Sequence, residues 1–578
     1  MVKRLGRRLL GYVARRWKLA TASLLASLAG SAAGLIAPLY ARNAVNMLVE
    51  GSIEHLWFYA VMIVTLTVVQ GLLSFATNFL SQYLAQRVVY DLRNEVYRHL
   101  QELSLGFYKR VDTGQLVARA TSDVEVSSRF IRFTFSGFAS AILTLALALY
   151  IMVSLNPLLT AYSLAPLPLM FVLVRIFTKK IRAVFERARE VYGQFTSHLT
   201  EVIGGLRVVR ALNASNYLLS RFLSMNEEYL ALTLRAARLR ALTWPSVGML
   251  FSLSLLIVLW IGGSMLVRGE ISVGDLVAMS LYVGMMVWPF IALGFFATMY
   301  ARTVAALSRV FEILDAEPEV RESENAVPLK VEKGEVRLEN VWFSYDGKKW
   351  VLKGVSFKAG PNEVVAVVGP TGSGKSTLVQ LIPRFYDPQR GRVLIDGTDI
   401  REVKLDSLRR QVGIVHQDIY VFPDTIRNNI AYGKPEASME EVIRAAKLAM
   451  LHDFIESLPR GYDTVVGEKG VTLSGGQRQR LAIARTLLMD PKIVILDDSM
   501  SNVDAETERA IYEALTKHFK GKTIIVITQR PSTMRLADRI VVLQDGRVVE
   551  EGTHDELLRR EGIYAKLYDI LAPEAGVK

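Results

Sequence analysis

Six long apolar stretches in the first 300 residues constrain the fold of this chain more than any other feature. They cover about 19–40, 56–79, 136–155, 158–177, 247–267 and 276–300. An α-helix needs roughly 20 apolar residues to cross the hydrocarbon core of a bilayer. Since no water reaches that core to satisfy the backbone, such spans form helices that pair their own N–H and C=O groups. The sequence therefore predicts a six-helix transmembrane domain over residues 1–315.

The basic residues predict how these helices are oriented. The chain has 69 Lys and Arg against 56 Asp and Glu, a net charge of +13. The basic residues gather before the first span and in the long connections 80–135 and 178–246, as in cytoplasmic loops. We therefore predict a multi-pass protein of the cell (plasma) membrane, in contact with the lipid bilayer and with both termini cytoplasmic, and no nucleic acid partner. Helical apolar spacing in the long connections predicts membrane helices that continue into the cytosol.

The second half of the chain has the pattern of a water-soluble α/β domain. The polar, acidic segment 316–333 predicts a linker, and short strands and helices alternate over 334–578. Cys is absent, which excludes disulfides, thiol nucleophiles and Cys-based metal sites. The predicted fold class is multidomain: an all-α six-helix transmembrane domain with long cytosolic helix extensions, followed by an α/β domain.

A phosphate-binding loop lies in the stretch "VVAVVGPTGSGKSTL". The apolar strand 364–368 leads into a glycine-rich loop and then a helical sequence, the context that the pattern G-x-x-x-x-G-K-[ST] requires. Glycines let backbone N–H groups surround phosphate oxygens, and the helix N-terminus adds positive potential. Lys375 is predicted to reach the terminal phosphates of ATP, and the Ser376 hydroxyl to bind Mg²⁺. The predicted ATP-binding loop is Gly369, Pro370, Thr371, Gly372, Ser373, Gly374, Lys375, Ser376 and Thr377.

The sequence "LSGGQRQRLAIARTLL" resembles the signature of ABC ATPases. In that family the start of this helix binds the γ-phosphate of an ATP held by the opposite subunit. The resemblance therefore implies two P-loop ABC nucleotide-binding domains that close around ATP. The signature residues are Leu473, Ser474, Gly475, Gly476 and Gln477.

Other elements of the family follow in order. Tyr345 stands where an aromatic residue stacks on adenine, and Gln417 where a glutamine contacts Mg²⁺ and the attacking water. The stretch 464–470 resembles an exporter-specific loop, while 106–125 and 196–217 resemble intracellular loops that end in coupling helices. Six spans ahead of one nucleotide-binding domain resemble the half-transporter of ABC exporters of the type IV, multidrug and lipid exporter kind.

Two adjacent acids end the apolar strand 493–496. Asp497 fits the acid that holds Mg²⁺ through its water shell, together with Ser376 and Gln417. Asp498 stands where the family normally has the catalytic glutamate. Since Asp is one methylene shorter, and a misplacement of about 1 Å can cost on the order of 10²-fold in rate, hydrolysis at this site is predicted to be slow.

A second departure lies in "TIIVITQRPST". Gln529 stands where the family has a histidine; it can donate a hydrogen bond but cannot become a cation or shuttle a proton. Both departures fall on residues tied to hydrolysis, a pattern that resembles the degenerate half of heterodimeric ABC exporters. That resemblance implies a second half-transporter with the missing glutamate and histidine, whose active site this chain's signature completes. The resemblance also implies that Ser501 and Asp504 belong to a D-loop at the same interface.

The transported molecule is less constrained by the sequence. The spans carry almost no charge at mid-depth, which argues against an ion pathway. Met279, Tyr282, Met286 and Phe290 share one face of the last span; flexible Met and aromatic groups suit a pocket for varied apolar molecules, although a lipid-facing or helix-packing stripe gives the same pattern. The predicted function is ATP-driven export of a hydrophobic or amphipathic drug, lipid or peptide. The alternatives are a homodimeric exporter with slow ATPase activity and an ATP-gated channel or regulatory subunit.

Overall fold

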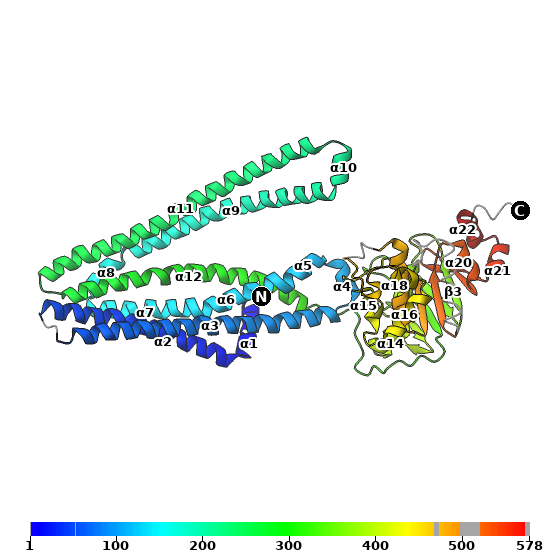
Figure 1. The fold of residues 1–578 in the computed structure, drawn as a ribbon, viewed down its shortest axis with the longest axis horizontal. Coiled ribbons are helices and arrows are strands. Elements are labelled where there is room, and N and C mark those ends of the chain that lie inside the picture. The colour runs from blue at the N-terminus through cyan, green and yellow to red at the C-terminus, as the bar shows by residue number, and fades with distance from the viewer. Residues whose placement is uncertain (1, 52–53, 468–472, 498–520, 573–578) are drawn as a thin grey trace. The chain divides into compact units, whose positions relative to one another are not determined.

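The computed structural model describes residues 2–51, 54–467, 473–497 and 521–572 (Figure 1). The chain divides into two compact units. The helical unit comprises residues 1–101 and 114–315, and the α/β unit comprises residues 102–113 and 316–578. This confirms the predicted fold class, a helical domain followed by a sheet-containing domain.

Long helices build the helical unit. They are α1 (Val2–Ala14), α2 (Trp17–Val49), α3 (Leu56–Glu102), α5 (Thr113–Ala118), α6 (Val124–Phe133), α7 (Ala139–Leu155), α8 (Pro157–Leu164), α9 (Pro166–Gly204), α10 (Leu206–Ala211), α11 (Ser215–Val267) and α12 (Val273–Leu314), with π-helical turns η1 (Arg119–Asp123) and η2 (Thr134–Phe138) on either side of α6. Five helical segments of the described residues are long and apolar enough to cross a membrane: Trp17–Val49, Leu56–Glu102, Thr113–Leu155, Ser215–Val267 and Val273–Leu314.

The stretch predicted as the fourth span, 158–177, is divided between two helices. Helix α8 ends at Leu164 and α9 begins at Pro166, because proline has no N–H to continue the hydrogen-bond ladder. Helix α9 then soon reaches Arg175 and the basic pair at 179–180. This pair of helices is therefore not among the five segments that are long and apolar enough on their own.

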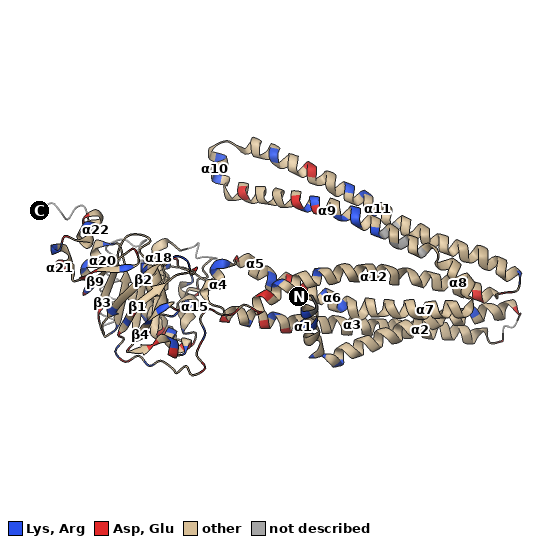
Figure 2. Cartoon of the chain, turned by 180° about the vertical axis from the view of Figure 1, so that it is seen from behind, with Lys and Arg blue, Asp and Glu red and all other residues tan. Residues whose placement is uncertain are grey.

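Several helices are much longer than a bilayer is thick. Helix α3 has 47 residues, about 70 Å at 1.5 Å per residue, whereas the hydrocarbon core is about 30 Å thick. Helices α9 and α11 run side by side and diverge from the bundle of α2, α3, α7 and α12 (Figure 1). Charged residues gather toward the α10 end of this pair, while the spans of the bundle carry few (Figure 2). The predicted helix extensions are thus a feature of the fold.

The stripe predicted on the last span lies in the core of the bundle. Met279 and Tyr282 are 0% exposed and Met286 is 1% exposed, and the Tyr282 hydroxyl donates to the Leu35 carbonyl at 2.6 Å. Phe290 packs at the edge of the same cluster. In this conformation the stripe joins α12 to α2 and α7, and a substrate pocket at these residues stays a prediction.

The α/β unit contains two sheets. Its strands are β1 (Val336–Phe343), β2 (Leu352–Ala359), β3 (Val364–Val368), β4 (Arg390–Ile395), β5 (Thr398–Asp399), β6 (Val412–Val415), β7 (Ile493–Asp497), β8 (Thr523–Ile527), β9 (Arg539–Gln544) and β10 (Arg547–Gly552). The smaller sheet is antiparallel, in the order β2-β1-β4-β5. The larger has the order β10-β9-β3-β8-β7-β6 and is parallel except for β10. Strands β7 and β8 are buried along their whole length, as expected of parallel strands covered on both faces.

Helices complete the α/β unit. They are α4 (Leu105–Arg110), α13 (Lys375–Leu381), α14 (Leu405–Gln411), α15 (Ile426–Ile430), α16 (Met439–Leu448), α17 (His452–Glu456), α18 (Gly475–Leu488), α20 (Pro531–Leu536), α21 (His554–Arg559) and α22 (Ile563–Leu571), with 3₁₀ turns η3 (Ile400–Glu402), η4 (Ala431–Gly433) and η5 (Gly461–Asp463).

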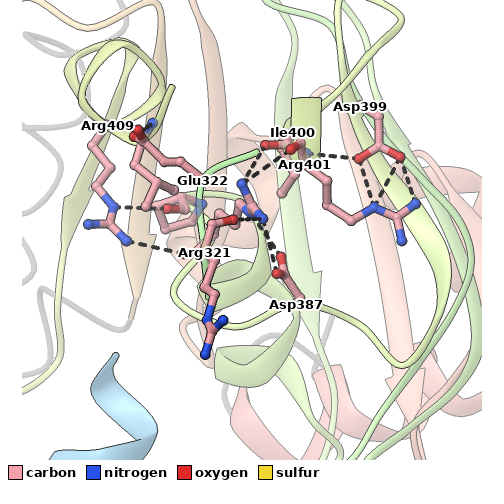
Figure 3. Close-up of polar contacts among 10 residues, drawn as sticks. Arg321, Glu322, Asp387, Asp399, Ile400, Arg401 and Arg409 are labelled. Atoms are coloured by element: carbon pink, nitrogen blue, oxygen red, sulfur yellow. Dashed lines mark hydrogen bonds and ion pairs between the residues drawn. The ribbon is translucent and has the colours of Figure 1, made fainter. Parts of the chain in front are cut away.

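The segment 316–333, predicted as a linker, belongs to the α/β unit. The guanidinium of Arg384, which is 3% exposed, donates to the Arg321 carbonyl at 2.9 Å and to the Asp387 carboxylate at 2.8 and 3.1 Å (Figure 3). The Glu322 carboxylate accepts from the Leu405 N–H at 2.6 Å. These bonds tie the start of the segment to the α/β core, so its polar composition does not make it a free tether.

Candidate ATP-binding site

The predicted site residues follow the carboxyl ends of neighbouring parallel strands. The glycine-rich loop follows β3, Asp497 ends β7, and Gln529 follows β8, whose Ile527 pairs with Asp497 in register. Gln417 follows β6 at the same edge. Since parallel strands end on one side of a sheet, this edge is where α/β folds bind ligands. A cavity of about 320 Å³ opens at this edge. Its lining includes Lys375, Gln417, Asp497 and Gln529.

The loop itself is shaped to surround an anion. Gly369 has φ +149° and a Cβ there would collide with the Leu543 carbonyl oxygen, while Gly374 has φ +102° just before α13. Only glycine takes these conformations without strain. The Lys375 ammonium donates to the carbonyls of Gly369 and Pro370, each at 2.8 Å. It therefore lies across the loop, where it can meet a phosphate that the loop holds.

One polar atom in the loop tests whether a phosphate fits. Ser373 is 4% exposed, and its hydroxyl has no hydrogen-bond partner among the described residues. A buried hydroxyl without a partner costs roughly 1–3 kcal/mol, and a phosphate oxygen in the loop supplies that partner. The donor set therefore fits the phosphates of ATP.

The position predicted to hold Mg²⁺ lies between α13 and β7. The Ser376 hydroxyl donates to Asp497 Oδ1 at 3.0 Å, and Asp497 is 4% exposed. The described part of the chain contains no cluster of three or more His, Asp or Glu that could bind a metal ion without other ligands. Mg²⁺ usually binds one or two carboxylates together with phosphates and water, so one hydroxyl and one carboxylate suit MgATP. Asp498, the second acid of the pair, lies outside the described residues.

Tyr345 is held by its neighbours with the ring partly open. It is 44% exposed, its hydroxyl lies 3.1 Å from Thr377 Oγ1, and Phe343 and Tyr386 pack edge-on against it at centroid distances of 4.9 and 5.2 Å. Asp346 fixes the following turn: backbone N–H groups and a serine hydroxyl donate to its carboxylate and lower its pKa to about 2. This anchor was not among the predicted residues, although the Asp-Gly pair is a turn signal.

Comparison with known proteins decides the family. Residues 20–290 match the family described as "ABC transporter transmembrane region" and residues 352–501 match "ABC transporter". The chain is 39% identical over 512 residues to YgaD of Bacillus subtilis strain 168, provisionally named a multidrug export ATP-binding/permease protein, covering 88% of each. This chain belongs to the ABC transporters. It is therefore a multi-pass membrane protein with an ATP-binding domain.

Two further likenesses extend this assignment. The chain is 38% identical over 525 residues to an ATP-dependent lipid A-core flippase of Syntrophus aciditrophicus strain SB, covering 91% of this chain and 87% of the relative. A bacterial Atm1-family ABC exporter solved with ATP bound superimposes with a TM-score of 0.81 at 31% identity, covering 97% of this chain and 99% of that one. The fold of this ABC transporter is thus that of an exporter.

The predicted signature of this ABC transporter starts α18 and lies outside the cavity. Ser474 Oγ accepts from the Gln477 N–H at 3.2 Å, and Gln477 Oε1 accepts from the Ser474 N–H at 2.8 Å, a capping box that fixes the helix start. Neither these two residues nor Leu473, Gly475 or Gly476 lines the P-loop cavity. The D-loop positions Ser501 and Asp504, and part of the stretch 464–470, lie outside the described residues.

A contact that the sequence did not reveal involves helix α4, in the predicted intracellular loop 106–125. The Lys109 ammonium lies over the Tyr345 ring, 4.4 Å from its centroid, and 5.3 Å from that of Tyr386. Arg110 pairs with Glu319, whose N–H donates to Ser104 Oγ at 3.2 Å. No local sequence pattern predicts a contact between Lys109 and Tyr345, because the two residues are far apart in the chain.

Proposed function

We propose that this chain is one half of a heterodimeric ABC exporter that moves a hydrophobic or amphipathic molecule out across the cell membrane. Two kinds of support bear on the cargo. One relative is named for multidrug export and another for flipping a lipid, and both cargoes have large apolar parts. The spans of this chain carry few charges (Figure 2), which favours apolar or amphipathic cargo over an ion.

The position of Gln529 carries the heterodimer proposal. Gln529 lines the same cavity as Lys375, Ser376, Gln417 and Asp497, so the residue expected to contact the γ-phosphate of ATP carries an amide. An amide remains neutral at every physiological pH and cannot pass a proton. The residues assigned to MgATP binding are present. The residue assigned to the γ-phosphate, Gln529, departs from the histidine of the family.

Each residue then has a role in a two-site transporter. In the site on this chain, Tyr345 stacks on adenine, Lys375 neutralises phosphate charge, and Ser376 with Asp497 holds Mg²⁺. ATP supplies the binding energy that draws two nucleotide-binding domains together, and its hydrolysis releases them. Because phosphoryl transfer depends mainly on positioning and charge, Asp498 and Gln529 make this site a slow one.

The site on the partner completes the scheme. We assign to the partner the glutamate and histidine that this chain lacks. The α18 helix start of this chain, Ser474–Gln477, closes over the ATP of that site. This chain thus contributes to turnover mainly through its signature.

The test is the ATPase activity of the chain alone. Full-length protein in lipid nanodiscs should bind a fluorescent ATP analogue but hydrolyse ATP slowly, and Lys375→Ala should abolish that binding. The double change Asp498→Glu with Gln529→His should raise hydrolysis, because it restores the base and the switch. Brisk turnover by the unaltered homodimer would contradict the heterodimer proposal and favour a homodimeric exporter.

A further inference from the structure

A polar cavity lies among the helices of the helical unit, and none of the four residues predicted to bind cargo lines it, although Tyr282 bonds to Leu35 on its wall. It has a volume of about 210 Å³ and is lined by α2, α3 and the η2–α7 segment, with Met285 of α12 at one side, and it is open along α3, where Gln70, Ser74 and Asn78 are exposed. Its walls are mainly Ser, Thr, Asn, Gln and Gly, and none of the Asp, Glu, Lys, Arg or His residues that the structure describes lines it. A polar but uncharged cavity is unusual among spans of this hydropathy, because each buried polar group is costly in a bilayer.

The polar residues repeat with helical spacing on each wall. Residues four apart lie on one face of a helix, so each wall presents a continuous polar row to the cavity. The sequence contains this signal, although it is spread over three separate spans. Two of the rows are Gln70, Ser74 and Asn78 on α3, and Ser136, Ser140 and Thr144 on η2 and α7.

Helix packing explains part of this surface but not all of it. Ser31 and Ser140 share a hydrogen bond of 2.6 Å between α2 and α7, as small polar residues often do between membrane helices. Ser27, however, is 4% exposed and its hydroxyl has no partner among the described residues. A buried hydroxyl left unpaired costs roughly 1–3 kcal/mol, which packing alone does not recover.

Gln70 and Asn78 supply amide groups on the α3 wall of the cavity. The Gln70 amide lies against Gly34, so closely that a Cβ on Gly34 would collide with Gln70 Nε2. Because Gly34 has no side chain, the Gln70 amide can occupy this space on the cavity wall. Asn78 Nδ2 donates to the Ser74 carbonyl at 2.9 Å, which leaves its oxygen able to accept further bonds.

We propose that this cavity receives the uncharged, hydrogen-bonding head of an amphipathic substrate, one that carries hydroxyl or amide groups. The inference rests on the proposed export function and narrows its substrate class. The volume equals about seven waters at roughly 30 Å³ each and is below the 300–1,000 Å³ typical of drug-sized pockets. It therefore holds a head group and leaves the apolar tail among the helices or in lipid. An ionised head would meet no counter-charge on the walls, which is costly in a medium of low dielectric.

The experiment compares head groups on one chain length. The full-length transporter in lipid nanodiscs is titrated with a brominated monoacylglycerol, and binding is followed by quenching of tryptophan fluorescence without ATP. A fatty acid and an alkyltrimethylammonium of equal chain length then compete with it, as does free glycerol. We expect saturable binding of the monoacylglycerol, and competitors with charged heads at least tenfold weaker. Free glycerol should not compete at millimolar concentration, because it lacks the tail.

Variants tie the binding to the cavity. Gln70→Leu and, separately, Ser74→Ala should each weaken monoacylglycerol binding by about 2–10-fold, the change that one hydrogen bond accounts for. Thr67→Val is the matched control, because Thr67 lies on the same helix, donates to the Ile63 carbonyl at 2.8 Å and does not line the cavity. The milder Ser74→Ala change keeps the test valid if Gln70→Leu fails to fold.

The outcomes separate this inference from the export proposal. Equal or tighter binding of a charged head, competition by glycerol as strong as that by the monoacylglycerol, or no change in both Gln70→Leu and Ser74→Ala would overturn the inference. Because binding is measured without ATP, loss of ATP-driven transport with head-group preference intact would count against the export proposal alone. Transport of wholly apolar molecules with no head-group preference would count against the inference alone.

Discussion

The ammonium of Lys109 lies over the ring of Tyr345, 4.4 Å from its centroid. Tyr345 is the residue assigned to adenine, and Lys109 belongs to α4, a short helix that follows the long helix α3. A cation over an aromatic face contributes about 0.5–1 kcal/mol at exposed sites. The ring that we assign to adenine is therefore already in contact with a residue from the predicted intracellular loop.

We predict that adenine and Lys109 compete for this ring. Lys109→Ala should tighten binding of a fluorescent ATP analogue by roughly 2–5-fold, the equivalent of one exposed cation–π contact, whereas Lys109→Arg should keep the wild-type affinity. Lys348→Ala is the control, because it removes a positive charge from the turn after Tyr345 without touching the ring. Unchanged or weaker binding in Lys109→Ala would mean that the lysine and the adenine do not share a face.

The second prediction concerns Mg²⁺. Asp497, which accepts a hydrogen bond from Ser376 at 3.0 Å, is expected to act on the ion through its water shell. Outer-shell partners of this kind contribute about 10–100-fold to metal affinity. Asp497→Asn should therefore raise by that factor the Mg²⁺ concentration needed for tight ATP binding, while binding in EDTA stays as weak as in the wild type.

The control for that titration is Asp490→Asn. Asp490, whose side chain is 73% exposed, pairs with Lys522 and does not line the cavity. It should leave the Mg²⁺ dependence unchanged. A normal Mg²⁺ curve in Asp497→Asn would remove Asp497 from the metal site.

The shape of the phosphate loop and the five long apolar helices were within reach of the sequence because each depends on residues close together in the chain. A strand that leads into Gly369–Ser376 specifies its own backbone path, and about 20 apolar residues specify a long helix unless a proline such as Pro166 divides them. Lys109 over Tyr345 depends instead on how α4 packs on a sheet far along the chain. The space beside Gly34 likewise exists only because α3 places Gln70 there.

The segment 316–333 shows a second limit of composition. Acidic and proline-rich sequence is typical of linkers, yet Arg384 and the N–H of Leu405 bind this segment to the α/β core. Composition indicates that the polar groups need hydrogen-bond partners. It does not indicate whether water or a neighbouring element of the fold supplies these partners.

The third prediction tests that attachment. The Arg384 side chain is 4% exposed and Asp387 is its carboxylate partner, 28% exposed. Removing one member of a buried pair leaves the other charge without compensation. Because Asp387 is partly solvated, we expect Asp387→Asn to lower the free energy of unfolding by about 2 kcal/mol. The denaturant midpoint followed by tryptophan fluorescence measures this.

Asp406→Asn is the matched control for that measurement. Asp406 forms an exposed ion pair with Arg410 at 3.3 Å. Exposed pairs contribute little, so the change should stay near 0.5 kcal/mol or less. Equal losses from both variants would show that the Arg384 contacts add nothing beyond surface charge.

The last prediction concerns pH and the C-terminal helices. His554 Nδ1 lies 2.6 Å from the Tyr564 hydroxyl and its ring 5.0 Å from that of Tyr568. Burial, and then the positive charge of Arg535, lower the pKa of His554 below its usual 6.5, although Asp555 acts in the opposite direction. The unfolded chain therefore takes up a proton at this histidine before the folded protein does.

Above about pH 6.5, His554 costs the protein no free energy of unfolding. As the pH drops toward the pKa of His554 in the folded protein, the free energy of unfolding falls. His554→Gln should flatten that fall in denaturant midpoints measured between about pH 5 and 8. His55→Gln, in the helical unit, should leave the slope unchanged. An equal slope in His554→Gln and the wild type would show that another group carries the acid sensitivity.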